Sequence, residues 1–252
     1  MRRRRGIYLL PNLFTTAGLF AGFYAITSAS NGKFEAAAIA IFVAMLMDGI
    51  DGRVARLTNT QSAFGAEYDS MADMVSFGVA PALVMFHWSL FSLAKFGWLA
   101  AFVYAAGAAL RLARFNTQVG IADKRYFQGL PSPAAAALLA GLIWLSVWFD
   151  ISGRELNIAV FLLTFLAGIL MVSNIRYHSF KDVDLKGKVS FVSLVTLMIV
   201  FALTYLHPPI VLFSAFFIYA LLGPILTLIS LRKRKKKRAT DAEQADTSKY
   251  KS

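Results

Sequence analysis

The sequence predicts an all-α, polytopic membrane helix bundle with about eight transmembrane helices and both termini in the cytoplasm. Three observations lead to this fold class: an apolar composition, a succession of long apolar runs, and a one-sided distribution of basic residues. Of the 252 residues, 58% are hydrophobic and only 16% are charged, and the mean hydropathy of +0.59 lies above the range of soluble domains. The chain has no cysteine, which excludes disulfides, thiolate zinc sites and thiol nucleophiles.

The apolar runs indicate where helices cross the membrane. A helix needs about 20 mostly apolar residues to span the hydrocarbon layer, and roughly eight runs approach that length. They cover residues 9–28, 34–53, 74–93, 97–114, 133–149, 156–173, 189–206 and 210–231. Pro81 and Pro224 fall inside runs, where neighbouring helices can satisfy the backbone groups that a proline leaves free. We therefore expect one transmembrane domain, residues 1–231, followed by a basic, disordered cytoplasmic tail, residues 232–252.

The basic residues set the orientation. Of the 26 lysines and arginines, only Lys33, Lys95 and Arg154 fall in loops assigned to the outer side, and such a bias is typical of cytoplasmic loops. The run RKRKKKR directly follows the last apolar run, so it is expected to contact lipid headgroups rather than nucleic acid. The opening MRRRRGIYLL has the shape of a signal peptide. We expect it to be retained, because the first helix then brings Asn12 to the cytoplasmic face.

Four aspartates lie where the second and third runs meet the cytoplasm: Asp48, Asp51, Asp69 and Asp73. Spacings of three and four residues place each pair on one face of a helix. The link between the two runs is short, so we expect the helices to be antiparallel neighbours with all four carboxylates converging. Acids inside a membrane mark functional sites. Carboxylate oxygens without histidine or cysteine suit Mg²⁺, Mn²⁺ or Ca²⁺.

The alternative is that these are interfacial acids paired with Arg53 and Arg56. Two arginines cannot neutralise the four aspartates and Glu67, so a divalent cation remains the better counter-charge. Two metal ions held by carboxylates usually bind phosphates. Small residues interleaved with the acids would let a bulky ligand approach the backbone, and they are Gly49, Gly52, Ala55, Gly65 and Ala66. The pattern indicates a nucleotide or diphosphate substrate at the membrane surface.

The spacing resembles the signature of the CDP-alcohol phosphotransferase family. It runs Asp51-Gly52, two residues, Ala55-Arg56, eight residues, Gly65, three residues, Asp69, three residues and Asp73. The resemblance implies a CDP-linked lipid whose diphosphate binds two divalent ions, Mg²⁺ or Mn²⁺, at the cytoplasmic face. An alcohol attacks one phosphorus and CMP leaves, either directly or through a covalent intermediate.

The resemblance also implies roles for individual residues. Asp48, Asp51 and Asp69 would be metal ligands, and Asp73 a ligand, the general base, or both, so that Asp69 and Asp73 form the catalytic pair. The residues implied at the nucleotide are Asn12, Gly52, Ala55, Arg56 and Gly65.

Other segments resemble the integral-membrane bacterial phosphatidylserine synthases within this family: LPNLFTTAGLFAGFYAI, ALRLARFNTQ, YFQGLPSPAAAA and VSNIRYHSFKD. That branch implies CDP-diacylglycerol and L-serine as substrates, and a homodimer in the bacterial inner membrane. Gly18 and Gly22 have the spacing of a helix-packing motif. An arginine can hold a carboxylate with two hydrogen bonds. The candidate residues for the acceptor or phosphate are Arg111, Arg114, Asn116, Gln128 and Ser132.

Three alternatives stay open. A phosphatidylglycerophosphate or phosphatidylinositol-phosphate synthase would use the same signature, and its anionic acceptor would suit the basic loops. A relative acting on CDP-archaeol would differ only in the lipid tails. A divalent-cation or phosphate transporter belongs to a different class, and it would need polar residues through the outer half of the bilayer. The outer halves of these runs are almost wholly apolar.

Overall fold

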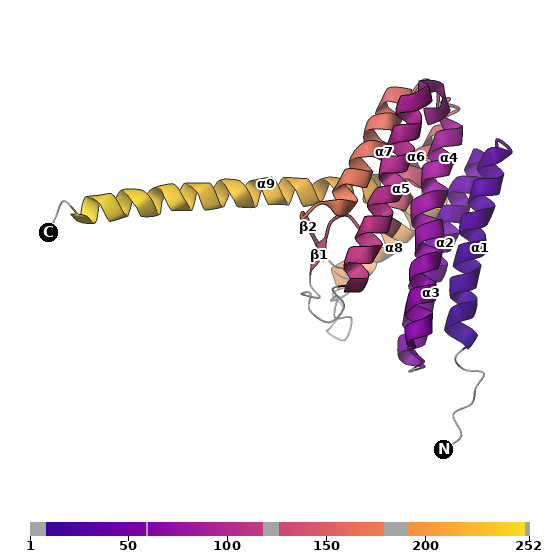
Figure 1. Ribbon diagram of the computed structural model, residues 1–252, viewed down its shortest axis with the longest axis horizontal. Coiled ribbons are helices and arrows are strands. Elements are labelled where there is room, and N and C mark those ends of the chain that lie inside the picture. The colour runs from indigo at the N-terminus through magenta and orange to yellow at the C-terminus, as the bar shows by residue number, and fades with distance from the viewer. Residues whose placement is uncertain (1–8, 59, 118–125, 179–190, 250–252) are drawn as a thin grey trace, which may run out of the picture.

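The computed structural model describes residues 9–58, 60–117, 126–178 and 191–249, and these residues are mostly helical (Figure 1). The α-helices are α1 (Leu9–Ser30), α2 (Phe34–Leu57), α3 (Ala63–Asp73), α4 (Ala80–Trp88), α5 (Ala94–Thr117), α6 (Ser132–Trp148), α7 (Asn157–Val172), α8 (Phe191–Leu206) and α9 (Pro208–Lys249). A π-helix, η1 (Met74–Val79), joins α3 to α4, and a 3-10 turn, η2 (Leu90–Leu93), precedes α5. The helical class is as the sequence predicts.

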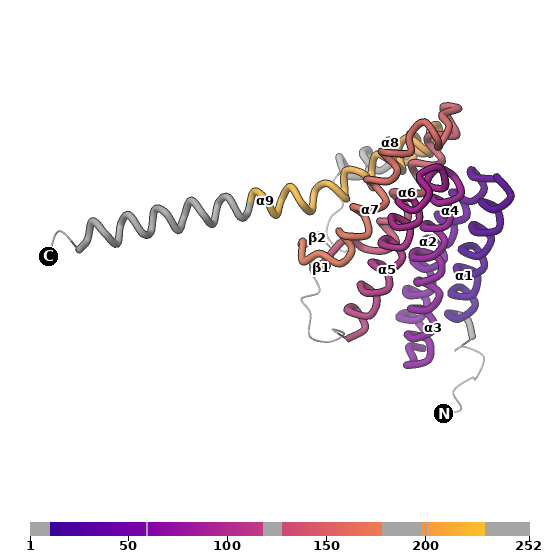
Figure 2. Tube along the Cα trace, turned by 45° about the horizontal axis from the view of Figure 1, so that its top comes forward, coloured from indigo at the N-terminus to yellow at the C-terminus, as the bar shows by residue number. Residues whose placement is uncertain are grey.

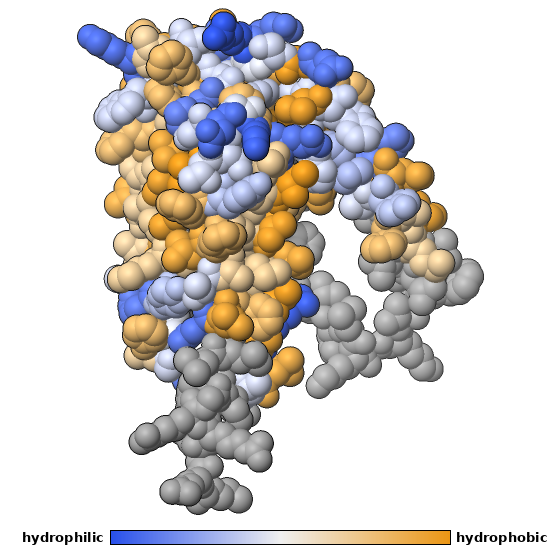
Figure 3. Space-filling view, turned by 90° about the vertical axis from the view of Figure 1, so that its right-hand side faces the viewer, coloured by the Kyte–Doolittle hydropathy of each residue, from blue (hydrophilic) through white to orange (hydrophobic). Residues whose placement is uncertain are grey.

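Within the described residues, four helical stretches are long and apolar enough to cross a membrane: Pro11–Ser30, Ala63–Trp88, Leu90–Thr117 and Pro208–Ile229. Helices α6 and α7 are apolar but have 17 and 16 residues, less than a usual span. Apolar side chains gather over the middle of the bundle, between polar groups nearer its ends (Figure 3). A membrane-embedded helical bundle therefore fits the described residues, whereas the count of eight crossings and the side of the termini stay predictions.

Helix α9 leaves the bundle and continues to Lys249 (Figure 1). Residues 232–249, expected to lack regular structure, are thus part of this helix. The stretch contains no glycine or proline and many residues with good helix propensity. Helical structure therefore does not mark the domain boundary at residue 231, which stays a prediction.

Two short strands depart from the all-α expectation. Strand β1 (Tyr126–Gln128) pairs antiparallel with β2 (Arg176–His178), with Phe127 opposite Tyr177. After β1, Gly129 adopts a positive φ of 78° and its backbone N–H bonds to the Ile175 carbonyl at 2.8 Å. This turn leads directly into α6, as the glycine and prolines of GLPSP indicate.

Gly18 and Gly22, the glycines of the packing motif on α1, pack against other helices of the same chain. A Cβ atom on Gly22 would lie 2.8 Å from the Ser76 Cα, and one on Gly18 would lie 3.6 Å from the Ala44 carbonyl oxygen. The Ser76 hydroxyl also donates to the Gly18 carbonyl at 3.1 Å. Because α1 packs on α2 and η1 through these glycines, they give no separate evidence for a dimer.

The helix that leads into the third apolar run begins at Ala63, because Ser62 caps α3 by accepting a 3.0 Å bond from the Gly65 N–H, and it includes Asp69 and Asp73 as the spacing predicts. The widened helical turn η1, which follows α3, has a local cause in Pro81. Pro81 has no N–H for the Phe77 carbonyl four residues earlier, and its ring crowds that turn. The Ala80 N–H bonds to the Val75 carbonyl five residues back. The buried Tyr104 hydroxyl donates to the Phe77 carbonyl at 3.1 Å.

The same arrangement occurs at the second internal proline. Pro224 cannot donate to the Ala220 carbonyl, and the Tyr177 hydroxyl donates to that carbonyl at 3.0 Å instead. Burial, reinforced by Tyr219, raises the pKa of Tyr177 to about 12, so the phenol stays protonated and able to donate. A side chain on Gly223 would overlap the Tyr177 ring. Strand β2 is therefore anchored against the bend of α9.

We expect Tyr104→Phe to lower the free energy of unfolding by about 1–3 kcal/mol, because a buried carbonyl loses its hydrogen-bond donor. Thermal unfolding of the purified protein in detergent measures this loss. Tyr205→Phe is the matched control, because the Tyr205 side chain is exposed. Equal unfolding temperatures for the two variants would contradict the assigned role of the Tyr104 hydroxyl.

Candidate active site

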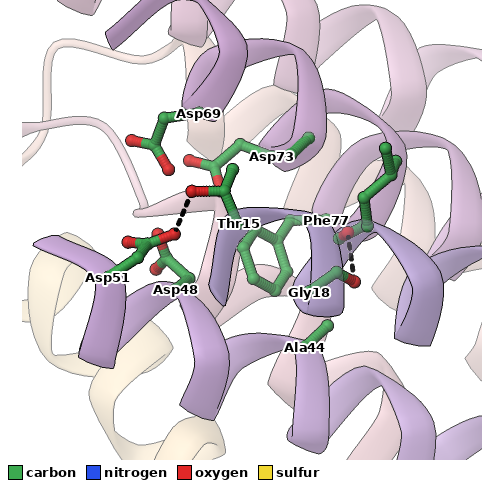
Figure 4. Close-up of a pocket in the computed structure, with 11 residues that line it drawn as sticks. Thr15, Gly18, Ala44, Asp48, Asp51, Asp69, Asp73 and Phe77 are labelled. Carbon is green, nitrogen blue, oxygen red and sulfur yellow. Dashed lines mark hydrogen bonds between the residues drawn. The ribbon is translucent and has the colours of Figure 1, made fainter. Parts of the chain in front are cut away.

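The four signature aspartates line one recess (Figure 4). It has an empty volume of ≈ 180 Å³, including the part open to solvent. Oxygen atoms of Asp48, Asp51 and Asp69 lie within 4.8 Å of one another. Asp73, one turn after Asp69 on α3, lines the same space. The structure therefore brings together the four carboxylates that the sequence spacing singles out.

The helices meet differently from the expectation. Residues of α2 and α3 make few close backbone approaches, so these two helices are not packed neighbours at the level of the acids. Helix α1 instead packs against both of them and against η1, and Figures 1 and 2 both place it alongside α2. The carboxylates occupy the space that remains between α2 and α3.

Besides the aspartates, the recess has two polar residues that were not predicted from the sequence, Ser76 and Thr15, and Thr15 contacts an aspartate. Its hydroxyl is buried and donates to Asp51 Oδ2 at 2.8 Å (Figure 4). Asp51 itself is only 5% exposed. The available signal was a pair of adjacent threonines, Thr15 and Thr16, in a mostly apolar helix, but the partner of Thr15 on α2 could not be read from local spacing.

The donor set fits a hard divalent cation. Two oxygens bound to the same Mg²⁺ or Ca²⁺ ion lie up to about 4–5 Å apart, which matches the 4.8 Å spread of the oxygens of Asp48, Asp51 and Asp69. Three carboxylates this close repel one another unless a cation or protons neutralise them. The candidate ligand atoms are all carboxylate oxygens, the type that magnesium, manganese and calcium prefer. The cluster could therefore hold a metal ion.

The two arginines of α5 differ in environment, although the sequence places them on one helix face. Arg111 is 9% exposed, and its Nη1 donates to the buried Ser132 hydroxyl at 2.8 Å. It lies near enough to Asp73 to interact with its charge. Among the described residues, the Arg111 Nε has no hydrogen-bond partner. Arg111 and Ser132 thus form a buried pair beside the carboxylates.

Arg114 lies nearer the surface and donates from Nη1 to Asn174 Oδ1 at 3.3 Å. The Asn116 amide is engaged on α3: it donates to the Ser70 hydroxyl at 3.0 Å and accepts from it at 3.2 Å. Gln128 is exposed and lies opposite Arg176 in the strand pair. Asn116 therefore links α5 to α3. Gln128 belongs to the strand pair and to neither α5 nor α6.

The residues implied at the nucleotide lie on α1, α2 and α3, the same helices that carry Thr15 and the aspartates of the recess. A Cβ atom on Gly52 would meet nothing within 4 Å, and one on Gly65 would lie 3.5 Å from Asn12 Oδ1. Helical geometry puts Gly52 and Ala55 on the same face of α2 as Asp48 and Asp51. Arg56 is exposed. Open backbone thus adjoins the carboxylates on α2, and Asn12 lies beside the first turn of α3.

An acidic recess within a bundle of apolar helices, carrying the signature at residues 48–73, defines a membrane-embedded transferase of CDP-linked alcohols. The sequence profile of the CDP-alcohol phosphatidyltransferase family matches residues 8–229, and the chain belongs to this family.

The chain is 37% identical over 235 residues to the CDP-diacylglycerol–serine O-phosphatidyltransferase of Helicobacter pylori, covering 92% of this chain and 98% of that protein. Enzymes of the same name are similar over shorter stretches. The one from Mycobacterium bovis is 42% identical over 166 residues, 59% of this chain and 57% of its own. The one from Methanocaldococcus jannaschii is 40% identical over 142 residues, 56% of this chain and 63% of its own.

Proposed function

We propose that the chain transfers the phosphatidyl group of CDP-diacylglycerol to the hydroxyl of L-serine, giving phosphatidylserine and CMP. The observation that carries the proposal is the convergence of the four signature carboxylates in one recess. The serine acceptor is supported by the similarity along nearly the full length to the Helicobacter pylori enzyme of that activity.

In this reaction Asp48, Asp51 and Asp69 would hold the divalent metal, and Asp73 would be a further ligand. The metal is Mg²⁺ or Mn²⁺, with two ions per site. When bound, the metal neutralises charge on the diphosphate and on the leaving CMP. The serine oxygen forms a bond to the phosphorus that carries diacylglycerol, and the bond from that phosphorus to the CMP oxygen breaks. Asp73 lies in the same recess, so its carboxylate takes the proton that the serine hydroxyl loses.

The chain's other residues bind and orient the substrates. The open backbone at Gly52 and Ala55 gives the cytidine nucleotide room next to the acids, and Asn12, Gly65 and Arg56 contact its outer part. Arg111 is held by Ser132 near Asp73, where its charge partly balances the carboxylates. Arg114 is less buried and can turn from Asn174 to fork onto the serine carboxylate. Asn116 and Gln128 extend this acceptor side.

The test is CMP release by the purified protein with CDP-diacylglycerol, Mn²⁺ or Mg²⁺, and a panel of acceptors: L-serine, glycerol 3-phosphate and inositol phosphate. We expect release that depends on both metal and serine. Turnover with glycerol 3-phosphate or inositol phosphate but not with serine would overturn the acceptor assignment. Release that persists in a metal chelator would overturn the metal site.

We expect Arg114→Lys to raise the apparent KM for serine several-fold with little change in the KM for CDP-diacylglycerol. A lysine keeps the charge but cannot form the two parallel hydrogen bonds of a guanidinium. Steady-state kinetics with each substrate varied in turn measure the two constants. Arg53→Lys is the control, because Arg53 is exposed on the side of α2 away from the acids. Equal effects of the two substitutions on the KM for serine would contradict the role given to Arg114.

We also propose eight membrane crossings, both termini inside, and an active site at the cytoplasmic face of a bacterial inner membrane, with the enzyme a homodimer. The absence of cysteine makes single-cysteine labelling unambiguous. With a membrane-impermeant maleimide on intact cells, Lys33→Cys should react and Arg56→Cys should react only after the membrane is permeabilised. The reverse pattern would overturn this orientation.

A further inference from the structure

Two neighbouring threonines on α1 connect to the two acid-bearing helices. The buried Thr15 hydroxyl lies 2.8 Å from Asp51 Oδ2 on α2. The Thr16 hydroxyl lies 2.9 Å from the hydroxyl of Tyr68 on α3. Tyr68 immediately precedes Asp69 in the chain. Two adjacent residues of α1 therefore contact the two helices that carry the carboxylate cluster.

The hydrogen-bond directions support a bridging role. The Thr16 hydroxyl donates to the Asn12 carbonyl at 2.7 Å, so its oxygen is left to accept from the Tyr68 hydroxyl. The Thr15 hydroxyl has two acceptors, and Asp51 Oδ2 at 2.8 Å is closer than the Pro11 carbonyl at 3.2 Å. Both side chains thus complete bonds outside their own helix.

These bonds matter because α2 and α3 make few close backbone approaches to each other, whereas α1 packs against both. The position of Asp51 relative to Asp69 therefore depends on how α1 packs against α2 and α3. Helix α3 has a single buried residue, Ala72, so apolar packing alone holds this helix weakly. A second polar contact, from Ser70 to Asn116 on α5, holds its other side.

We propose that Thr15 and Thr16 are positioning residues that set the spacing and orientation of the two halves of the metal-binding carboxylate cluster. Hydrogen bonds to a ligating carboxylate from outside the metal site fix its orientation, and their loss typically lowers metal affinity by about 10–100-fold. The inference rests on the proposed function in one respect: it takes the aspartates to be metal ligands. It adds residues of α1, which the family signature at residues 48–73 does not contain.

The chain offers a matched control on the same helix. Thr27 also lies on α1, but its hydroxyl bonds to the Phe23 carbonyl at 3.3 Å and the Tyr24 carbonyl at 3.0 Å, within α1 itself. Replacing Thr27 by valine makes the same chemical change as replacing Thr15 or Thr16. It leaves the contacts between α1 and the acid-bearing helices intact.

The experiment measures Mn²⁺ binding to the purified full-length protein in detergent, from the loss of the electron paramagnetic resonance signal of free Mn²⁺. We expect Thr15→Val to raise the Kd for Mn²⁺ about 10-fold or more and Thr16→Val to raise it by a smaller factor. Thr15→Ser, which restores the hydroxyl, should return the Kd to the wild-type value. Thr27→Val should leave it unchanged. Thermal unfolding without metal confirms that each variant is folded, and Thr15→Ala replaces Thr15→Val if the latter is not.

The outcomes separate the inference from the function on which it rests. Wild-type affinity in folded Thr15→Val and Thr16→Val proteins overturns the positioning role and leaves the proposed function intact. An equal loss of affinity in Thr27→Val also overturns it, because the effect then comes from α1 in general. Failure of the wild-type protein to bind Mn²⁺ overturns the proposed metal site, and the positioning role with it.

Discussion

We expect Asp69→Asn and Asp73→Asn each to lower CMP release by about 10²–10⁴-fold or more while leaving the protein folded. Asparagine keeps the shape of aspartate but loses its negative charge and its basicity. The substitution therefore removes a metal ligand at Asp69 and the proton acceptor at Asp73. It also relieves repulsion among close carboxylates, so unfolding without metal should occur at the wild-type temperature or above it.

Two measurements on each variant distinguish a lost function from a lost fold. The first is CMP release, and the second is the thermal unfolding temperature with and without Mn²⁺. Metal that binds only the folded protein stabilises it, so the wild-type protein should gain stability with Mn²⁺ and Asp69→Asn should gain much less.

The control for this pair is Asp150→Asn, away from the recess. Asp150 has a positive φ of 54°, a backbone conformation that asparagine also adopts readily. Its substitution should change neither turnover nor the effect of metal. Wild-type turnover in Asp69→Asn or Asp73→Asn would contradict the role given to that residue.

Gly168→Ala should lower the free energy of unfolding by about 1–3 kcal/mol, although alanine has the higher helix propensity. A Cβ atom on Gly168 would lie 2.8 Å from the Tyr104 Cα and 2.8 Å from the Val103 carbonyl oxygen. These are backbone atoms of α5, so α5 and α7 would have to move apart. Tyr104 and Arg111 lie on α5, and displacing this helix should also reduce turnover.

The control for Gly168 is Gly49→Ala in α2, where a Cβ atom would meet nothing within 4 Å. There the higher helix propensity of alanine should raise the free energy of unfolding by about 0.5–1 kcal/mol. Chemical or thermal unfolding in the same detergent compares the two variants. Equal stability changes would contradict the close packing of α5 on α7.

The composition and the residues between Asp48 and Asp73 determined the class and the reaction. Membrane embedding follows from an apolar composition, which no tertiary contact alters. The faces of Asp48 and Asp51, and of Asp69 and Asp73, follow from helical periodicity, which acts over three to four residues. The signature therefore identified the carboxylates before any packing was known.

Other features depended on contacts between helices. Thr15 meets Asp51 across 36 positions, and Arg111 meets Ser132 across 21. Local spacing says which face a residue occupies but not which helix covers that face. The short link between the second and third runs led to an expectation of neighbouring helices, whereas α1 packs on both.

The two internal prolines show which features follow from the sequence and which depend on the tertiary structure. Sequence alone determined that Pro81 and Pro224 each leave a carbonyl without its helical donor, because proline has no N–H. Only the tertiary structure decided the replacements, Tyr104 for the Phe77 carbonyl and Tyr177 for the Ala220 carbonyl. A missing donor is a property of one residue, whereas its substitute depends on which helix or strand the packed bundle brings alongside.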